Sequence, residues 1–556
     1  MPSSACNPTI SFAFLLVFFA AVSLYVNQLH LQDIPTVKHA HLQSFLSEGN
    51  AQQDDDDAES ATDYTASNFS LAGLSCERWG GPSDEASQEM VYWSDIPEDN
   101  RHISPFYRPN QFLTFEPDNG GWNNIRMAME TVLALAFAMG RTLVLPPEKE
   151  FYLLTAKHHQ GQQQRKHFSF AHFFNMRAIH EEHAGLSIIS MSEFLSEHVM
   201  KGQFVDRATG QATFPPGNRT EWDGAPPAEM DELFRWLRKV AHVAPWNPEK
   251  CLAAFPKERD NDANLRELEL QMKNNPPHWE DYVDNPVPVD APAVDRLAEN
   301  WAERDGLCIY DTEMQHSPLV HFSGDQKLGA RLLVHFYAFL FMEDWKQDLW
   351  GKRFIRDHVR YIDSIQCAAA RVVQAIRQRV RLNWNSESGE FDSFHIRRGD
   401  FQYKKTRVEA SQILQQAQKK IKDGATVYIA TDERDKSYFN PLMEHYDVVF
   451  LDDFMAELRG INSNYFGMID QLVASRGRIF FGCWFSTFSS YIMRLRGYHE
   501  GKQKVPGYDQ GISNSWYYAL EDRFDHMQHY YPVKKVFYAR EFPTSWRMID
   551  FHTGVP

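Results

Sequence analysis

The sequence predicts an α/β protein with parallel, doubly wound sheets, and two features support this prediction. In the second half of the chain, apolar strand-like runs alternate with helical stretches, an order typical of such sheets. In the first half, a strand, a glycine-rich turn, a helix and a second strand follow one another as a βαβ unit. The strand-like runs of the second half lie at 391–397, 426–430, 447–451 and 478–482.

An uncharged, mostly apolar segment occupies residues 9–26, after a short tail at 1–8. As a helix, such a segment spans about 27 Å, close to the thickness of a bilayer's hydrocarbon core. We therefore expect a transmembrane signal-anchor. The alternative is a cleaved signal peptide with the weak site Ala21-Val22-Ser23. Because no Lys or Arg precedes Lys38, flanking charges predict no orientation.

Residues 27–90 are polar and include the run Asp54–Asp57, which predicts a flexible acidic stem rather than a metal site. Two N-glycosylation sequons follow the apolar segment, at Asn68 and Asn218. Together with an amino-terminal anchor, they favour a single-pass type II protein of the Golgi or endoplasmic reticulum membrane. The catalytic body is then expected in the lumen.

The βαβ unit lies near the start of a first folded lobe, which we expect over residues 91–355. A strand at 111–115 leads into the turn Asn119-Gly120-Gly121-Trp122-Asn123-Asn124. Apolar residues at helical spacing then predict a helix over 125–139, followed by a strand at 142–146.

The rest of the chain divides into four further segments. Residues 205–300 are rich in Pro and charge and poorly periodic, which predicts an insertion of loops and short helices. Apolar spacing from Arg356 to Val380 predicts one long amphipathic helix, which we expect to connect the lobes over 356–382. A second lobe at 383–535 and a tail at 536–556 complete the expected organisation.

Charge and cysteine content exclude some classes of function. The formal net charge of −17 argues against nucleic acid as the main partner, since such a partner requires neutralised phosphates. An anionic ligand therefore needs a local basic cluster. Of six cysteines, Cys6 precedes the apolar segment, so the others allow at most two disulfides and leave one thiol. Their spacing leaves the pairing open.

Side chains suited to binding a nucleoside diphosphate follow three predicted strands of the second lobe. Phe394–Asp400 (FHIRRGD) ends a strand with two arginines, whose guanidinium forks match phosphate geometry. Thr431-Asp432-Glu433 follows the next strand, and the hydroxyl-rich turn Cys483–Ser490 opens a helix after the last one. Because parallel strands end along one edge of a sheet, we expect these segments to form a pyrophosphate site there.

Each segment also has an ordinary structural interpretation. The two arginines can be surface residues satisfied by Asp400, and the aspartate and serines of the other segments can be helix caps. Side chains alternate along a strand, so His395 and Arg397 should share one face. Arg398 should lie on the other face and brace Asp400.

On these residues the chain resembles the GDP-fucose protein O-fucosyltransferase family. The resemblance rests on Gly120–Pro146, His395–Asp400, Ala430–Glu433 and Phe481–Tyr498, and the middle insertion is unmatched. The His-x-Arg-Arg-Gly-Asp motif is also similar to that of glycan fucosyltransferases that make α1,2 links. The resemblance implies a GT-B fold, in which two Rossmann-like lobes face a central cleft. It further implies inverting, metal-independent transfer of fucose from GDP-fucose to a glycoprotein or glycan hydroxyl, without a cofactor.

The resemblance also implies roles for individual residues. Arg397 is expected to contact the donor β-phosphate during catalysis, and Asp432 to face the nucleoside. Asn123 or Asn124 is expected near the reacting sugar. The other donor-binding residues that the resemblance implies are Gly120, Gly121, His395, Asp400, Ser486, Thr487 and Phe488.

One departure from the family leaves the general base unassigned. Some members carry a glutamate in the glycine turn, where this chain has Asn119-Gly120-Gly121. Glu116 and Asp118 are nearby candidates, although turn and capping roles suit both. The departure motivates a rival hypothesis, a catalytically silent protein that binds a nucleotide sugar or glycan. A third hypothesis is a cytosolic-facing nucleotide-binding protein.

The sequence also bears on whether the reaction requires a metal ion. The only discrete Asp-x-Asp, Asp260-Asn261-Asp262, lies in a charged stretch without a predicted strand. Arg397, helped by the turn Ser486–Ser489, is therefore expected to stabilise the charge on the leaving diphosphate in place of a metal.

Overall fold

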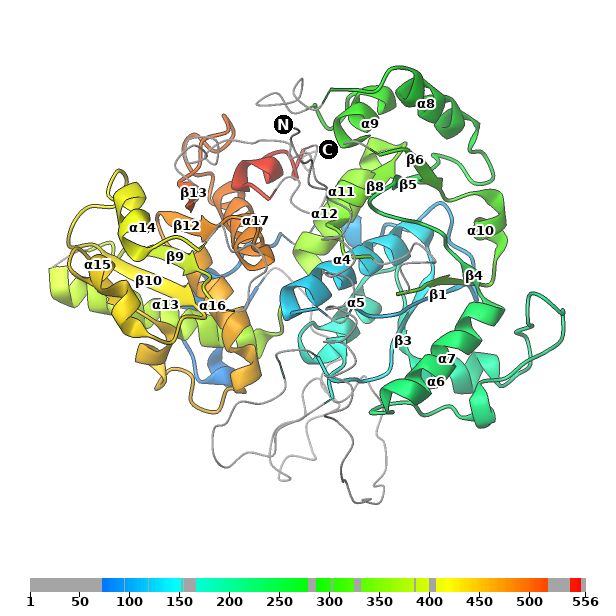
Figure 1. Ribbon diagram of the computed structural model, residues 1–556, viewed down its shortest axis with the longest axis horizontal. Helices are drawn as coiled ribbons and strands as arrows, with labels where there is room; N and C mark the ends of the chain where they lie inside the picture. Colours follow the sequence, from blue (N-terminus) through cyan, green and yellow to red (C-terminus); the bar gives the residue numbers. More distant parts are fainter. Residues whose placement is uncertain are drawn as a thin grey trace, which may run out of the picture. The chain divides into compact units, whose positions relative to one another are not determined.

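Three parallel β-sheets and the helices around them make up the computed structural model of the chain (Figure 1). All described residues belong to one compact unit, Gln52–Pro556. The segment 9–26, Asn68 and Asp400 lie outside the described residues. The structure describes residues 73–94, 96–118, 120–151, 154, 167–278, 287–301, 304–324, 332–384, 387–399, 407–518 and 541–551. Within these ranges, no helix is long and apolar enough to cross a membrane.

The first sheet has the strand order β3-β2-β1-β7-β4, and all its neighbouring strands are parallel. The strand β1 (Phe112–Phe115) is central, between β2 (Thr142–Leu145) and β7 (Leu319–Phe322). The strands β3 (Ile188–Ser190) and β4 (His242–Val243) form its edges. The predicted βαβ unit is confirmed.

Helices cover both faces of this sheet. The helix α4 (Trp122–Met139) packs on one face together with α12 (Trp345–His358). The short α6 (Met191–Phe194) and the amphipathic α7 (Pro227–Val240) share an apolar core with β1, β2 and β7 on the other face. Gly140 ends α4 in a left-handed conformation with φ 63°, where a side chain would collide with the backbone of Tyr107.

The second sheet has the order β11-β10-β9-β12-β13 and is also parallel throughout. Four of its strands are those that the sequence predicts, and the fifth, β13, is a short aromatic run that the alternating pattern does not reveal. The strands are β9 (Asp392–Ile396), β10 (Thr426–Thr431), β11 (Asp447–Val449), β12 (Phe480–Cys483) and β13 (Ser515–Tyr518).

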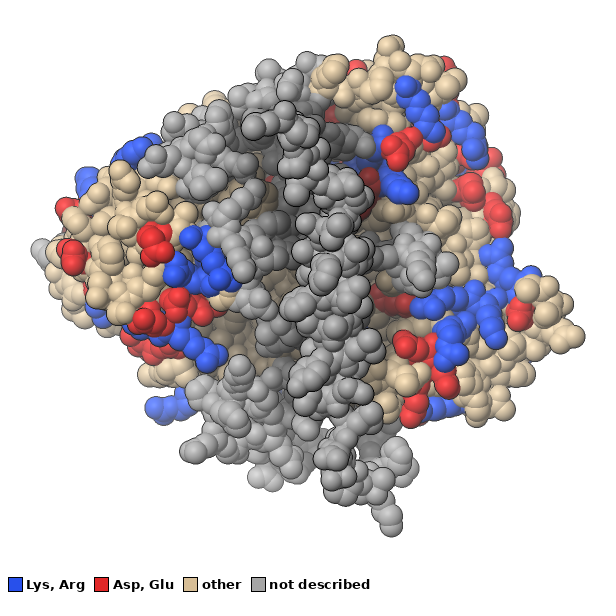
Figure 2. Space-filling view, viewed as in Figure 1, with Lys and Arg blue, Asp and Glu red and all other residues tan. Residues whose placement is uncertain are grey.

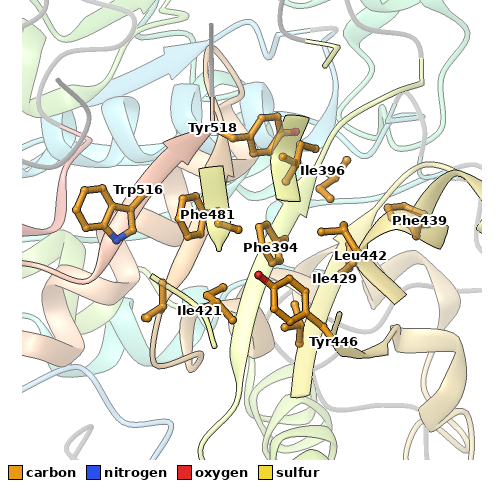
Figure 3. Packing of buried hydrophobic residues seen from close by; sticks show 14 of the residues in the cluster. Phe394, Ile396, Ile421, Ile429, Phe439, Leu442, Tyr446, Phe481, Trp516 and Tyr518 are labelled. Atoms are coloured by element: carbon orange, nitrogen blue, oxygen red, sulfur yellow. The ribbon is translucent and has the colours of Figure 1, made fainter. Parts of the chain in front are cut away.

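Alternation along β9 separates its core side chains from its functional ones. Phe394 and Ile396 lie in an apolar cluster with Phe481 and Tyr518, on the face covered by α14 (Ala410–Ala417) and α15 (Asn440–Met443) (Figure 3). Ser393 and His395 instead bond to α16 (Phe466–Ser475) and α17 (Thr487–Lys502), on the opposite face. The strand therefore presents His395 to the first turn of α17.

The prediction that residues 205–300 contain only loops and short helices is wrong. This region supplies β4 to the first sheet and β5 to a third parallel sheet of order β6-β5-β8. The strand β5 is a fully buried run of five residues whose charged neighbours hide it from periodicity analysis. The elements of this part are β5 (Cys251–Phe255), β6 (Gly306–Ile309), β8 (Leu340–Met342), α8 (Ala263–Asn274) and α9 (Ala293–Trp301).

The single long helix predicted over 356–382 is also wrong, because the structure has two helices here. The helix α12 ends at His358, and α13 (Asp363–Trp384) begins after a break. Tyr361 lies in the break, is fully buried, and pairs with Phe174 through an isolated β-bridge. Its tertiary contacts therefore override the helical spacing of the neighbouring apolar residues.

The remaining helical elements are short. The α-helices are α2 (Asp84–Gln88), α3 (Pro97–Asn100), α5 (Met176–Glu182), α10 (Thr312–His316) and α11 (Phe336–Phe339). Single 3₁₀ turns lie at Glu77–Trp79, Phe170–His172, Pro216–Asn218, Lys436–Phe439, Leu451–Phe454, Ser463–Tyr465 and Pro543–Trp546, and a π-helical turn at Leu195–Val199.

Two disulfides form among the cysteines. Cys76 pairs with Cys367 on α13, and Cys251 on β5 pairs with Cys308 on β6. Cys483 is buried at the end of β12 and belongs to neither of these two disulfides of the described residues. The pairing agrees with the expected maximum of two disulfides and one thiol.

A buried ion-pair cluster joins the helices of the two large sheets. Arg494 on α17 bonds to Glu130 on α4 at 2.7 Å and to Glu541 at 2.6 Å. Arg126, one turn before Glu130, bonds to the same carboxylate. The side chains of all four residues are at most 2% exposed. The packing between the helices of the two sheets thus includes buried charges that neutralise one another.

Candidate active site

The turn after β9 is built around Asp432. The Arg397 guanidinium forms an ion pair with Asp432 at 3.0 Å. The same carboxylate accepts hydrogen bonds from the backbone N–H groups of Arg398, at 2.8 Å, and Gly399, at 3.0 Å. A Cβ atom at Gly399 would lie 2.4 Å from Asp432 Oδ2, so a side chain there would displace this carboxylate. Asp432 therefore sets the position of Arg397 and shapes the turn.

Arg398 faces a different environment from Arg397, as alternation predicts. Its guanidinium lies over the ring of Tyr438, 4.1 Å from the centroid, and its Nε donates to Glu433 at 3.4 Å. A second carboxylate, Glu409, lies 3.6 Å away. The expected partner Asp400 lies outside the described residues.

His395 connects β9 to the start of α17. Its ring stacks on Phe488 with centroids 4.3 Å apart, and its Nδ1 lies 2.7 Å from Ser489 Oγ. The same Oγ accepts the backbone N–H of Cys483 at 2.8 Å. Burial lowers the pKa of His395 to about 3, while Asp432 raises it and Arg397 lowers it further. The imidazole is therefore neutral at physiological pH.

Two long helices begin here without side-chain caps. The N-cap residues are Gly121 for α4 and Ser486 for α17, and neither helix has an acidic residue in its first turn. Thr487 Oγ1 donates to Asn124 Oδ1 at 3.0 Å, which brings the two helix starts together. The first N–H groups of a helix have no intrahelical acceptor and carry a partial positive charge. The first N–H groups of α4 and of α17 meet at one place, which favours the binding of an anion there.

The turn into α17 has an unusual backbone. Phe485 adopts a left-handed conformation, with φ 66°, immediately before the N-cap residue. Bulky residues rarely adopt this conformation, and such strained residues cluster at functional sites.

A chain of hydrogen bonds fixes the first turn of α4. Gln471 on α16 donates to Asn123 Oδ1 at 2.7 Å and to the Phe488 carbonyl at 3.4 Å. Its own amide oxygen accepts the Tyr361 hydroxyl at 3.0 Å, and Tyr361 accepts from Trp122 Nε1 at 3.2 Å. Asn123, on a helix of the first sheet, is therefore held in position by a helix of the second sheet.

The candidate bases near the glycine turn are engaged in other bonds. Glu116 accepts two hydrogen bonds from Arg238, at 2.7 and 2.8 Å, and lies 3.0 Å from His321 Nε2. Burial raises the pKa of Glu116, but the bonds from His321 and Arg238 outweigh it and leave the pKa below its ordinary value. Asp118 accepts the Gly120 N–H at 2.6 Å, as a turn-forming aspartate does.

A cavity of about 780 Å³ lies beside these carboxylates, at the carboxyl end of the first sheet. Its charged lining residues are Glu116, Asp118, Lys149, Glu150 and Asp231, whereas Phe234 and Phe322 contribute apolar walls. Burial lowers the pKa of Lys149, while Asp118 and Glu116 raise it. The cavity combines apolar surface with a few polar groups, as small-molecule sites do.

The Asp-x-Asp segment is engaged at the surface. Asp260 pairs with Arg108 and His316, and Asp262 pairs with Arg266. In the part of the chain that the structure describes, no three His, Cys, Asp or Glu side chains come together as a metal site.

Basic and acidic side chains are interspersed on the face shown in Figure 2.

Sequence analysis does not predict the roles of two residues in this region. The Tyr518 hydroxyl accepts the backbone N–H of Arg397 at 3.2 Å, and Gln471 connects Asn123 to α17. The aromatic run at 515–518 is a signal for the strand that carries Tyr518. Gln471, a single polar residue inside an apolar helix, gives no comparable signal.

Comparisons with known proteins point to one family. A family model described as GDP-fucose protein O-fucosyltransferase matches residues 112–499. Among curated proteins, none matches the chain.

Two solved structures illustrate the structural similarity. POFUT1 in complex with GDP is 17% identical, covers 70% of this chain and 95% of its own, and has a TM-score of 0.32. The fucosyltransferase NodZ from Bradyrhizobium is 13% identical, covers 69% and 93%, and has a TM-score of 0.30.

The buried His395 predicts a pH dependence of stability. Between pH 6.5 and about 3, the unfolded chain binds a proton at His395 that the folded protein does not. The free energy of unfolding should therefore fall by about 1.4 kcal/mol per pH unit from this group as the pH is lowered. We expect His395→Gln to lose stability less steeply between pH 6 and 4, measured by urea unfolding. Equal slopes in the two proteins would contradict the assignment.

Proposed function

Because the chain belongs to the GDP-fucose protein O-fucosyltransferase family, we propose that it transfers fucose from GDP-fucose to a hydroxyl of a glycoprotein or glycan. We propose an inverting reaction in a GT-B arrangement, with the donor on the second sheet and the acceptor on the first. The observation that carries the proposal is the meeting of two uncapped helix starts through Thr487 and Asn124, with His395 and Arg397 ending the adjacent strand.

The donor's diphosphate suits this place electrostatically. As fucose departs, negative charge grows on the diphosphate, and a guanidinium together with helix N-terminal N–H groups stabilises it. Asp432 aims Arg397 through their ion pair, and Tyr518 fixes the backbone of Arg397. His395, being neutral, supports Phe488 and Ser489 without adding charge.

Asp432 also has capacity for the nucleoside. A carboxylate has about four acceptor positions, and the described partners of Asp432 occupy three of them. Its side chain is 28% exposed, so the remaining position can accept from a ribose hydroxyl or a base N–H. Gly120 and Gly121 let the backbone approach the sugar, and Asn123 and Asn124 lie beside it. The cavity next to α4 receives the acceptor.

One alternative has a specific observation in its favour. Both carboxylates near the glycine turn are engaged, Glu116 with Arg238 and Asp118 with the turn itself. A catalytically silent protein would bind GDP-fucose without turnover. An assay with labelled GDP-fucose and a mixture of glycoprotein acceptors separates the two, since only an enzyme releases GDP.

The sharpest prediction concerns Arg397. Arg397→Ala should lower turnover by roughly a hundred- to a thousand-fold, the cost of losing one donor that stabilises transition-state charge. Arg397→Lys keeps the charge but loses the fork, so it should recover only part of the activity. GDP release is the measurement.

Arg398→Ala is the matched control for this prediction. Its contacts with Tyr438 and Glu433 point to a structural role, so it should lower stability more than turnover. Wild-type turnover in a folded Arg397→Ala variant would refute the assignment of Arg397.

Metal-independence is a second part of the proposal. Because Arg397 and the helix starts supply positive charge, turnover should persist in excess chelator. Loss of GDP release on chelation, restored by Mn²⁺ or Mg²⁺, would replace the arginine mechanism with a metal mechanism.

We further propose a type II topology with a luminal body, supported by the apolar segment 9–26 and the two sequons. Asn218 is exposed, as glycan attachment requires. Glycosidase treatment should increase electrophoretic mobility in wild type but not in an Asn68→Gln, Asn218→Gln double variant. An unmodified wild-type protein from a secretory host would argue for the cytosolic alternative.

A further inference from the structure

A second cavity lies at the amino ends of the strands of the second sheet, whereas Arg397 follows the carboxyl end of β9. It has a volume of about 400 Å³ and is lined by residues that precede β9, β12 and β13, including Glu390, Arg478 and Asn514. The five residues of β9 separate it from the Arg397 turn, a length of about 16 Å. It is therefore distinct from the proposed donor site.

Four arginines line this cavity, and three of them are accounted for. Arg377 forms an ion pair with Glu89, and Arg478 forms two hydrogen bonds with Asp392, at 3.0 and 2.8 Å. Arg496 donates to Ser515 and to carbonyls at the end of α16, and lies 3.5 Å from Glu500. Arg496 therefore offsets part of the negative charge at the end of α16.

Arg476 is different from the other three. Among the described residues its guanidinium has no ion pair, and its buried Nε atom has no hydrogen-bond partner. His499 also lines the cavity and is 2% exposed, and its buried Nε2 atom has no hydrogen-bond partner among the described residues. This nitrogen is a donor in the neutral tautomer that carries the ring proton there. Buried polar atoms are nearly always paired in native proteins, so Arg476 Nε and His499 Nε2 point to a missing acceptor at this cavity.

The acidic residues around the cavity do not supply that acceptor. Glu89 and Asp392 are bound to Arg377 and Arg478, and Glu500 accepts from Ser513 at 3.0 Å. Glu390 is exposed at the rim. Burial lowers the pKa of Arg476 to about 9, repulsion by Arg377 and Arg496 adds to this, and the charge of Glu500 opposes it, so a bound anion would further stabilise the charged form of Arg476.

We propose that this cavity binds a compact anion, a phosphate or sulfate group, through Arg476 and His499. A guanidinium fork matches the tetrahedral oxygens of both groups. The volume accommodates the free ion or an ester on one sugar unit. This site goes beyond the proposed transfer reaction and does not depend on it.

The test uses the full chain and inorganic phosphate or sulfate as probes. In thermal unfolding and calorimetry, millimolar phosphate or sulfate should stabilise the wild-type protein beyond a chloride solution of equal ionic strength. Arg476→Met should weaken binding at least ten-fold, with Arg476→Lys intermediate. Without the anion, Arg476→Met should unfold at the same or a higher temperature, because it removes an unpaired charge.

Three comparisons make the result decisive. Arg459→Met changes the same charge at an exposed position and should retain the full response. Arg397→Ala should also retain it, and loss of the response there would place the anion at the donor site and overturn the proposal. Equal stabilisation of Arg476→Met and wild type, or none in wild type, would likewise overturn it.

The source of the anion is distinguished by comparing esters. Tighter binding of glucose 6-phosphate or glucose 6-sulfate than of the inorganic ions would identify a sugar ester as the ligand. Equal affinities would identify the free ion. If Arg476→Met does not fold, the Arg476→Lys and Arg397→Ala titrations decide the outcome.

Discussion

The arrangement of the site depends on the charge cluster around Arg494. A buried guanidinium is costly, and two carboxylates from opposite ends of the sequence offset that cost. Burial lowers the pKa of Arg494, but Glu130 and Glu541 outweigh it and hold the pKa well above its ordinary value. Because neither the arginine nor the carboxylates tolerate separation, α4 and α17 are held in one relative position.

This fixed position matters because the two helices start at the site. If α17 shifted along α4, the bond from Thr487 to Asn124 would be lost, and with it the meeting of the two positive helix ends. Gln471 adds a second constraint, since its amide bonds to residues of three helices or their connections. The site is therefore preorganised by the contacts that join the two sheets, and the strand β9 then adds Arg397 from one side.

Much of the second sheet can be predicted from the local sequence. Its four predicted strands are short apolar runs between helical segments, and the segments that follow three of them carry the side chains that meet at the site. The pairing of Asp432 with Arg397 was not predictable, because these residues follow two different strands and meet only when β9 and β10 pair in this register. In the same way, Tyr361 interrupts a helix that its neighbours favour, since its contacts with Phe174 and Gln471 are distant in sequence. The strand β5 escaped detection because full burial removes the alternation that identifies a strand.

The place of Glu541 in the ion-pair cluster has a consequence for biosynthesis. The residue comes 47 positions after Arg494 in the chain, yet it neutralises this arginine between the helices of the two large sheets. Because a chain is synthesised from its amino terminus, Glu130 and Arg494 are made before Glu541, so the contact between α4 and α17 carries an excess positive charge until Glu541 is added. Each sheet can form its own core earlier, but the charge of Arg494 is balanced only once Glu541 has joined the cluster. A protein that is truncated before this glutamate would retain most of its secondary structure and lose the relation between the two halves of its site.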